Sequence, residues 1–233
     1  MLLEVKNLEG GYGKKQVLFG ISFHIEAGEI VALIGHNGAG KSTILKSVFG
    51  LLTPHRGQVI YMNRDVTFES PAMKLDGGIY HIPQENFIFS DLTVKENLEM
   101  GFFTMKDQAS FEPRVETVHE IFPVLRNRKN QLAGTLSGGE RRMLGIGMGL
   151  LRHPKLIMLD EPSAGLSPVV FQNVIKIIQE INKSRGTAIL LVEQNVKVAF
   201  KISSRVYVMK AGYIILEETG EKLLQRDGWW DLF

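Results

Sequence analysis

Eight residues, Gly35-His-Asn-Gly-Ala-Gly-Lys-Ser42, limit the folds open to this chain more than any other feature of its sequence. They fit the pattern G-x-x-x-x-G-K-[ST], follow an apolar run at 30–34 and lead into a predicted helix at 42–49. Glycines in such a loop let backbone N–H groups turn inward around an anion, and the start of the helix adds positive potential. We therefore predict a phosphate-binding loop between a buried strand and a helix, with a nucleoside triphosphate as its ligand.

Two residues of this loop have predicted roles of their own. Lys41 would reach the β- and γ-phosphates with its ammonium group, and the hydroxyl of Ser42 would bind Mg²⁺. The alternative is a glycine-rich turn that carries an exposed lysine by chance, and the predicted strand and helix on either side argue against it. The other residues expected around the phosphates are Gly35, Asn37, Gly38, Ala39, Gly40 and Thr43.

A second apolar run, at 156–159, ends in two acidic residues, Asp160 and Glu161. In a parallel sheet its carboxyl end would lie at the same edge as the phosphate loop. Asp160 would then bind the water shell of Mg²⁺, and Glu161 would orient or deprotonate a water molecule that attacks the phosphate. The alternative is that both acids are solvated or cap a helix before Pro162.

The third motif is Leu136-Ser-Gly-Gly-Glu140. Ser137, Gly138 and Gly139 stand at the start of a predicted helix, where they would form a second phosphate-sized nest of N–H groups. One chain does not need two nests for one γ-phosphate, so we expect this nest to complete the site of another molecule. An ordinary N-cap by Ser137 is the alternative.

The rest of the sequence predicts an α/β protein with a mostly parallel core sheet. Apolar runs at 30–34, 79–82, 156–159 and 188–192 are typical of buried strands, and a helical apolar face lies at 170–181 between the last two. A strand, a helix and a strand at this spacing form a βαβ unit, whose strands are parallel.

Two further regions are expected around this core. Helical patterns dominate about 86–152, with one apolar stripe continuing through 115–125, which predicts a helical subdomain inserted in a single domain, 1–233. Strand-like segments joined by glycine-containing turns predict an antiparallel β flank made of 2–8, 21–25, 58–62, 205–209 and 213–217.

Composition argues against several classes of function. The longest apolar runs span five residues, whereas a membrane-spanning helix needs about 20. The 27 Lys and Arg residues against 25 Asp and Glu give a net charge of +2, too balanced for a nucleic-acid-binding tract. The chain has no Cys, which is compatible with the cytoplasm, and its six His residues lack the spacing of a metal site built by the protein alone.

In their order along the chain, the motifs at 35–42, Gln84, 136–140 and 156–161 resemble those of the ATP-binding subunit of an ABC transporter. The resemblance covers nearly the whole chain. It implies the P-loop NTPase fold of the ABC ATPases, with ATP and Mg²⁺ as ligands. It also implies that Gln84 reaches Mg²⁺ and senses the membrane subunits.

Further roles follow from the same resemblance. Tyr12 matches the aromatic residue that stacks on adenine in this family. Two ATPase subunits of the family sandwich two ATP molecules head to tail, so Ser137 and Gly139 of one subunit would face the γ-phosphate bound by the other.

The resemblance implies partners and a place in the cell. The chain would be a peripheral subunit on the cytoplasmic face of the inner (plasma) membrane. Its partners would be transmembrane permease subunits, a second ATPase subunit and, indirectly, a solute-binding protein, with no nucleic acid. Apolar residues at 87–92 would either line a groove for a membrane subunit or be buried in the helical subdomain.

Three longer stretches, 130–139, 89–98 and 191–195, are similar to the second ATPase of bacterial branched-chain amino-acid importers. Importers of urea and short-chain amides share much of this pattern, and Gln84 stands where many amino-acid members carry an acid. Import of urea or a short-chain amide therefore remains the alternative to import of branched-chain amino acids. The resemblance to this group implies a heterodimer of two ATPase chains, with a homodimer as the alternative. There are two rival functions: a soluble, non-transport ABC ATPase, and a module that holds ATP without turnover.

Three features depart from the family pattern. Gln194 stands where most members have a histidine that contacts the γ-phosphate; its amide donates a neutral hydrogen bond but cannot become a cation, so slower hydrolysis is expected. Ser167 stands where Asp is usual, which alters a contact across the dimer. Trp229 and Trp230 are expected to form a hydrophobic clasp onto the body of the protein.

Overall fold

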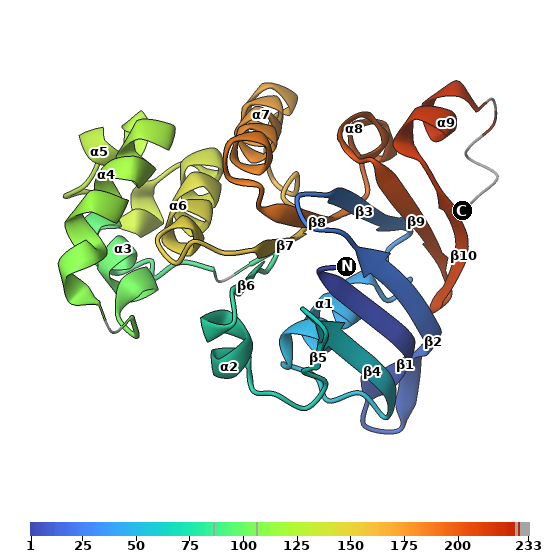
Figure 1. The fold of residues 1–233 in the computed structure, drawn as a ribbon. Coiled ribbons are helices and arrows are strands. Elements are labelled where there is room, and N and C mark those ends of the chain that lie inside the picture. The colour runs from blue at the N-terminus through green and yellow to red at the C-terminus, as the bar shows by residue number, and fades with distance from the viewer. Residues whose placement is uncertain (86, 106, 227, 229–233) are drawn as a thin grey trace. The chain divides into compact units, whose positions relative to one another are not determined.

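The computed structural model describes residues 1–85, 87–105, 107–226 and 228. The chain forms two compact units, one made of residues 1–81, 155–161 and those from 181 on, the other of 82–154 and 162–180 (Figure 1). The predicted clasp of Trp229 and Trp230 lies outside the described residues.

The first unit contains a six-stranded sheet with the strand order β10-β9-β3-β8-β7-β6. Strands β3 (Ile30–Gly35), β8 (Ala188–Glu193) and β7 (Leu156–Asp160) are fully buried and mutually parallel. Burial on both faces explains why each is a continuous apolar run in the sequence instead of an alternating pattern. The parallel core sheet is thus confirmed; β6 (Ile79–Ile82) is its edge strand.

The sheet also contains a segment that sequence reasoning assigned to the antiparallel flank. Strand β9 (Arg205–Lys210) pairs antiparallel with β10, as predicted, but it also pairs in parallel with β3. The placement of 205–209 in a separate flank is therefore wrong. The residues at 206–209 are all buried, and four apolar residues in a row are the pattern of a two-sided buried strand. Strand β10 (Tyr213–Glu218) is antiparallel to β9, and its alternating burial fits an edge strand.

A second, four-stranded sheet has the order β2-β1-β4-β5 and is antiparallel throughout (blue and teal in Figure 1). Its strands are longer than the sequence predicted because the pairing of β1 with β2 continues through several register shifts. Their bounds are β1 (Leu3–Tyr12), β2 (Lys15–Ile25), β4 (Arg56–Tyr61) and β5 (Arg64–Asp65).

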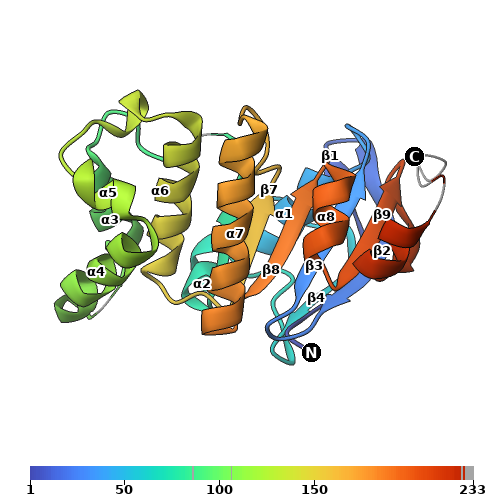
Figure 2. The ribbon, with the colours of Figure 1, turned by 90° about the horizontal axis from the view of Figure 1, so that it is seen from above.

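Alternate side chains of β3 join two different cores. Val31 and Leu33 pack in a cluster with residues of the antiparallel sheet and of helix α1 (Lys41–Phe49). Ala32 and Ile34 pack on the opposite face with α8 (Val196–Ile202) and α9 (Gly220–Gln225) (Figures 1 and 2). This period of two fixes β3, and with it the loop that follows β3, between two apolar layers. The short helix α2 (Pro71–Asp76) also belongs to this unit.

The second unit is helical. It contains α3 (Val94–Phe102), α4 (Phe111–Ile121), α5 (Pro123–Asn127), α6 (Gly138–Leu150) and most of α7 (Pro168–Arg185). A capping box between Thr93 and Glu96 starts α3, as the sequence predicted. The apolar stripe at 115–125 is not one helix: the chain breaks at Phe122, because Pro123 has no N–H to continue the ladder and starts α5 instead.

Helix α7 confirms the predicted apolar face, since Val174, Ile178 and Ile181 are all buried. Among the residues that the structure describes, no helix is both long and apolar enough to cross a membrane.

Candidate nucleotide-binding site

The glycine-rich loop joins the end of β3 to the start of α1 in the first unit. Gly38 and Gly40 have φ values of 80° and 103°, in the region that L side chains rarely adopt. A Cβ on Gly35 would lie 2.5 Å from the carbonyl oxygen of Met209 on β9. The loop therefore keeps its conformation only with glycine at these positions, and it leaves the backbone open to an anion at the N-terminus of α1.

Lys41 is the first residue of α1 and is only 4% exposed. Its Nζ donates hydrogen bonds to the carbonyl oxygens of Gly35 (2.8 Å) and His36 (3.1 Å) and lies 3.6 Å from Oε1 of Glu161. The ammonium group is thus folded back into the loop, next to the anion site that the loop would form.

Ser42 and Asp160 lie together at this edge of the sheet. The Ser42 hydroxyl donates a 3.0 Å hydrogen bond to Oδ1 of Asp160, the last residue of β7. Burial raises the pKa of Asp160, although the bond from Ser42 opposes the shift. A hydroxyl and a buried carboxylate are hard oxygen ligands, and a buried carboxylate needs a nearby cation, so this pair fits Mg²⁺.

Glu161 and Gln194 are 33 residues apart in the sequence and meet in space. Gln194 Nε2 donates a 2.6 Å hydrogen bond to Oε2 of Glu161. The Glu161 backbone has a φ of 46° and its N–H donates to the carbonyl of Val192. A left-handed glutamate costs about 1 kcal/mol or more, and here that conformation turns the carboxylate toward both Lys41 and Gln194.

Sequence reasoning missed Glu193, which is fully buried at the end of β8. Its Oε2 accepts hydrogen bonds from the backbone N–H groups of Gln194 (3.1 Å) and Asn195 (3.3 Å), and so fixes the turn that carries Gln194. The signal was present, because Glu193 ends the apolar run 188–192 as Asp160 ends the run 156–159.

Tyr12 stands at the end of β1 and is 47% exposed. The Nζ of Lys46 on α1 lies 5.7 Å from its ring centre, which links the tyrosine to the helix that follows the glycine-rich loop. An exposed aromatic ring beside the loop can stack on a flat base.

The serine and glycines of the third motif lie in the second unit. Ser137 caps α6: its hydroxyl accepts from the N–H of Glu140, and the Glu140 carboxylate accepts from the N–H (2.9 Å) and the hydroxyl (2.8 Å) of Ser137. A Cβ on Gly139 would lie 2.3 Å from Cγ1 of Val170, and one on Gly138 would lie 3.1 Å from a methyl of Leu166. A side chain at Gly139 would thus displace Val170, whereas one at Gly138 would only crowd Leu166. The N-cap by Ser137 that sequence reasoning held as an alternative is present, as part of a capping box with Glu140.

Gln84 is one of the residues that line a groove of about 330 Å³ in the second unit. Its carbonyl oxygen accepts a 3.2 Å hydrogen bond from Arg142, whose guanidinium lies 4.3 Å from the ring centre of Phe87. Phe87 and Ile88 line this groove, while Phe89 is 48% exposed. In the same unit the hydroxyl of Ser167 accepts a long bond, 3.4 Å, from the N–H of Val170 at the start of α7.

Residues 18–164 match the ABC transporter family. The high-affinity branched-chain amino acid transport ATP-binding protein BraG of Pseudomonas aeruginosa is 42% identical, over 91% of each chain. The probable branched-chain amino acid transport ATP-binding protein LivF of Archaeoglobus fulgidus is 38% identical, over 97% of this chain and 95% of its own.

Some less similar relatives have names that refer to another transport function. The lipopolysaccharide export system ATP-binding protein LptB of Escherichia coli is 33% identical over 96% of this chain and 92% of its own. Among solved structures, a nucleotide-free ATP-binding cassette from an ABC transporter superposes with a TM-score of 0.88 at 27% identity, covering 99% of this chain and 98% of its own. A cassette in its ADP conformation gives the same TM-score and identity, over 99% and 97%. The chain belongs to the ABC transporter family and is one of its ATP-binding domains.

Proposed function

We propose that this chain is the ATP-hydrolysing subunit of an importer for branched-chain amino acids. The observation that carries the proposal is the meeting of Lys41, Ser42, Asp160, Glu161 and Gln194 at one sheet edge, in a chain 42% identical to BraG.

Each of these side chains has a proposed task in hydrolysis. Lys41 neutralises the β- and γ-phosphates, and backbone N–H groups of 37–43 hold their oxygens. Ser42 and Asp160 would hold Mg²⁺, which when bound withdraws charge from the phosphate oxygens. Glu161 orients the attacking water and accepts its proton. Gln194 fixes the Glu161 carboxylate by its hydrogen bond and, being an amide, takes no part in proton transfer.

The partners are part of the same proposal. Ser137, Gly138 and Gly139 would face the γ-phosphate bound by a second ATPase subunit, a different chain in the working assembly. Gln84 would contact Mg²⁺, and the groove beside it would receive a transmembrane permease subunit. The two units of this chain would thus act as one ATPase domain on the cytoplasmic face of the membrane, supplied with solute by a binding protein. Urea or a short-chain amide is the alternative solute, because of Gln84.

Uptake of labelled leucine tests the proposal. Cells lacking the gene for this protein would be complemented with the wild type, Glu161→Gln or Glu120→Gln, the last an exposed glutamate on α4 that serves as the control. We expect the wild type and the control to restore uptake, Glu161→Gln to abolish it, and unlabelled urea not to compete. Competition by urea alone would contradict branched-chain amino acids as the solute. Uptake in cells that carry Glu161→Gln would contradict the proposal that hydrolysis by this chain powers import.

A further inference from the structure

Glu193 is a buried acid directly beside the candidate site, and none of the steps proposed above for hydrolysis uses it. It is the last residue of β8 and has no solvent-exposed surface, whereas the two residues after it, Gln194 and Asn195, are exposed. A carboxylate shielded from water is costly unless other donors replace the water. Its place in the fold therefore depends on the groups that donate to it.

Two of these donors come from the chain that immediately follows Glu193. Its Oε2 accepts the backbone N–H of Gln194 at 3.1 Å and that of Asn195 at 3.3 Å. Hydrogen bonds to an ionised acceptor are roughly twice as strong as those between neutral groups. One carboxylate oxygen thus holds two consecutive peptide groups, which restricts the direction of the turn between β8 and α8.

Gln194 is held at both polar groups of its backbone. Its N–H donates to Glu193, and its carbonyl oxygen accepts the N–H of Val196 at 2.9 Å. From this backbone the side-chain Nε2 reaches Oε2 of Glu161 at 2.6 Å. The direction in which the amide leaves the main chain is therefore fixed independently of its contact with Glu161.

Glu161 is attached to β8 without the help of Glu193. Its backbone N–H donates a 2.9 Å hydrogen bond to the carbonyl oxygen of Val192, and Asp160 before it pairs with Val192 in the register of β7 and β8. Loss of the Glu193 carboxylate would therefore leave Glu161 anchored to the strand and release the turn that carries Gln194.

We propose that Glu193 is a positioning residue for ATP hydrolysis, which acts through Gln194 by holding the backbone from which that amide reaches Glu161. The inference rests on the roles proposed above for Glu161 and Gln194. Both bonds end at one oxygen, and the amide of a glutamine would also supply an oxygen there. The role therefore requires a hydrogen-bond acceptor at this point and not a negative charge.

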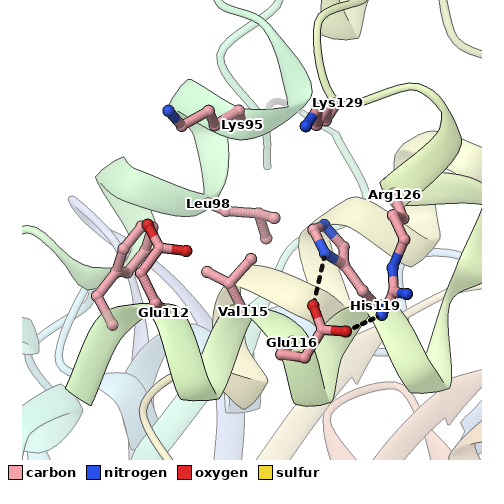
Figure 3. Close-up of a pocket in the computed structure, with 9 residues that line it drawn as sticks. Lys95, Leu98, Glu112, Val115, Glu116, His119, Arg126 and Lys129 are labelled. Atoms are coloured by element: carbon pink, nitrogen blue, oxygen red, sulfur yellow. Dashed lines mark hydrogen bonds and ion pairs between the residues drawn. The ribbon is translucent and has the colours of Figure 1, made fainter.

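Steady-state ATPase assays of the full chain test the proposal. Glu193→Leu removes the acceptor, and we expect kcat to fall by about tenfold, as in Gln194→Ala, with little change in KM. Glu193→Gln retains an acceptor oxygen and should keep kcat within about twofold of the wild type. The control is Glu112→Leu, at a glutamate that lines a cavity of the helical unit (Figure 3) and has no role in hydrolysis; it should leave kcat unchanged.

A double-mutant cycle distinguishes positioning from general damage to the site. If Glu193 acts through Gln194, Glu193→Leu should lower kcat by no more than about twofold in the Gln194→Ala background. An equal loss in both backgrounds would overturn the proposal, and so would a Glu193→Gln variant as slow as Glu193→Leu. If Gln194→Ala is slow and Glu193→Leu is as fast as the wild type, the positioning role alone fails. Wild-type rates in both variants would overturn the role of Gln194 as well.

Hydrogen exchange supplies a test that does not require Glu193→Leu to fold, which thermal unfolding checks. In the wild-type chain, the amide protons of Gln194 and Asn195 should exchange at least about tenfold more slowly than in an unstructured chain, because each is bonded to the buried Oε2. NMR measures both rates. Exchange of the two amides at the unstructured rate would overturn the proposal.

Discussion

The amide of Gln194 holds the carboxylate of Glu161 through a 2.6 Å hydrogen bond. The bond uses one N–H of the amide and one carboxylate oxygen, while the other carboxylate oxygen lies 3.6 Å from Lys41. The glutamate thus contacts the Lys41 ammonium on one side and, on the other, an amide that cannot take up a proton as an imidazole can.

Replacing Gln194 tests this arrangement. In Gln194→Ala the Glu161 carboxylate loses its hydrogen bond from the amide, and we expect kcat for ATP hydrolysis to fall by about tenfold with little change in KM. In Gln194→Glu a second carboxylate would replace the donor and repel Glu161, so the fall should be larger than in Gln194→Ala. Steady-state ATPase assays check both; an unchanged kcat in Gln194→Ala would show that the hydrogen bond has no catalytic consequence.

Glu161→Gln should lower kcat by about a hundredfold or more, because it removes the group that accepts a proton from the attacking water. Binding of ATP should persist, since Lys41 and Ser42 are unchanged, and a dimer that cannot complete hydrolysis should accumulate. Gel filtration with and without ATP measures the dimer. Hydrolysis by the variant at the wild-type rate would contradict the role of Glu161.

Gly139→Ala should lower the free energy of unfolding by about 1–3 kcal/mol, because the added methyl would meet Cγ1 of Val170 at 2.3 Å. Val170→Ala opens the space that the new methyl needs. The double variant Gly139→Ala/Val170→Ala should therefore be more stable than the sum of the two single changes predicts, as a double-mutant cycle in urea would measure. Strict additivity would mean that the two side chains do not compete for this space.

His81 should make stability depend on pH. Burial lowers its pKa from 6.5 to about 4, and its ring packs against Phe49. Between pH 6.5 and 4 the unfolded chain binds a proton that the folded chain does not, so folded-state stability is lost as the pH falls through this window.

The variant His81→Leu removes this titration. Relative to the wild type, it should gain stability on the order of 2–3 kcal/mol as the pH falls from 6.5 to 4. Urea unfolding at several pH values checks the expectation, with His55→Gln at an exposed histidine as the control. A constant difference between His81→Leu and the wild type would show that His81 does not titrate in this window.

Most of the fold could be predicted from the motifs, because each motif specifies a local conformation at the end of a buried strand or the start of a helix. The loop after 30–34, the acids after 156–159 and the cap at Ser137 all lie where their local patterns predicted. Strand β9 was misassigned because the sequence does not say which strand a segment pairs with, and a turn at Ala211-Gly212 suggested only a hairpin.

Contacts between distant residues were the least predictable part of the site. The bond between Gln194 and Glu161 depends on β7 and β8 being adjacent, on the backbone turn at Glu161 and on the buried Glu193. The adjacency of β7 and β8 is not a local property, so the sequence could suggest a role for each residue but not their contact.

The ion pair between Lys41 and Glu161 has a consequence for the order of events at the site. The same ammonium that would receive a phosphate also holds the carboxylate that would receive a proton, and a single charge cannot serve both fully. A phosphate entering the loop would compete with the Glu161 carboxylate for the Lys41 ammonium. Glu161 would leave this ion pair only once a phosphate is in the loop, so the two side chains would couple the position of Glu161 to occupation of the loop.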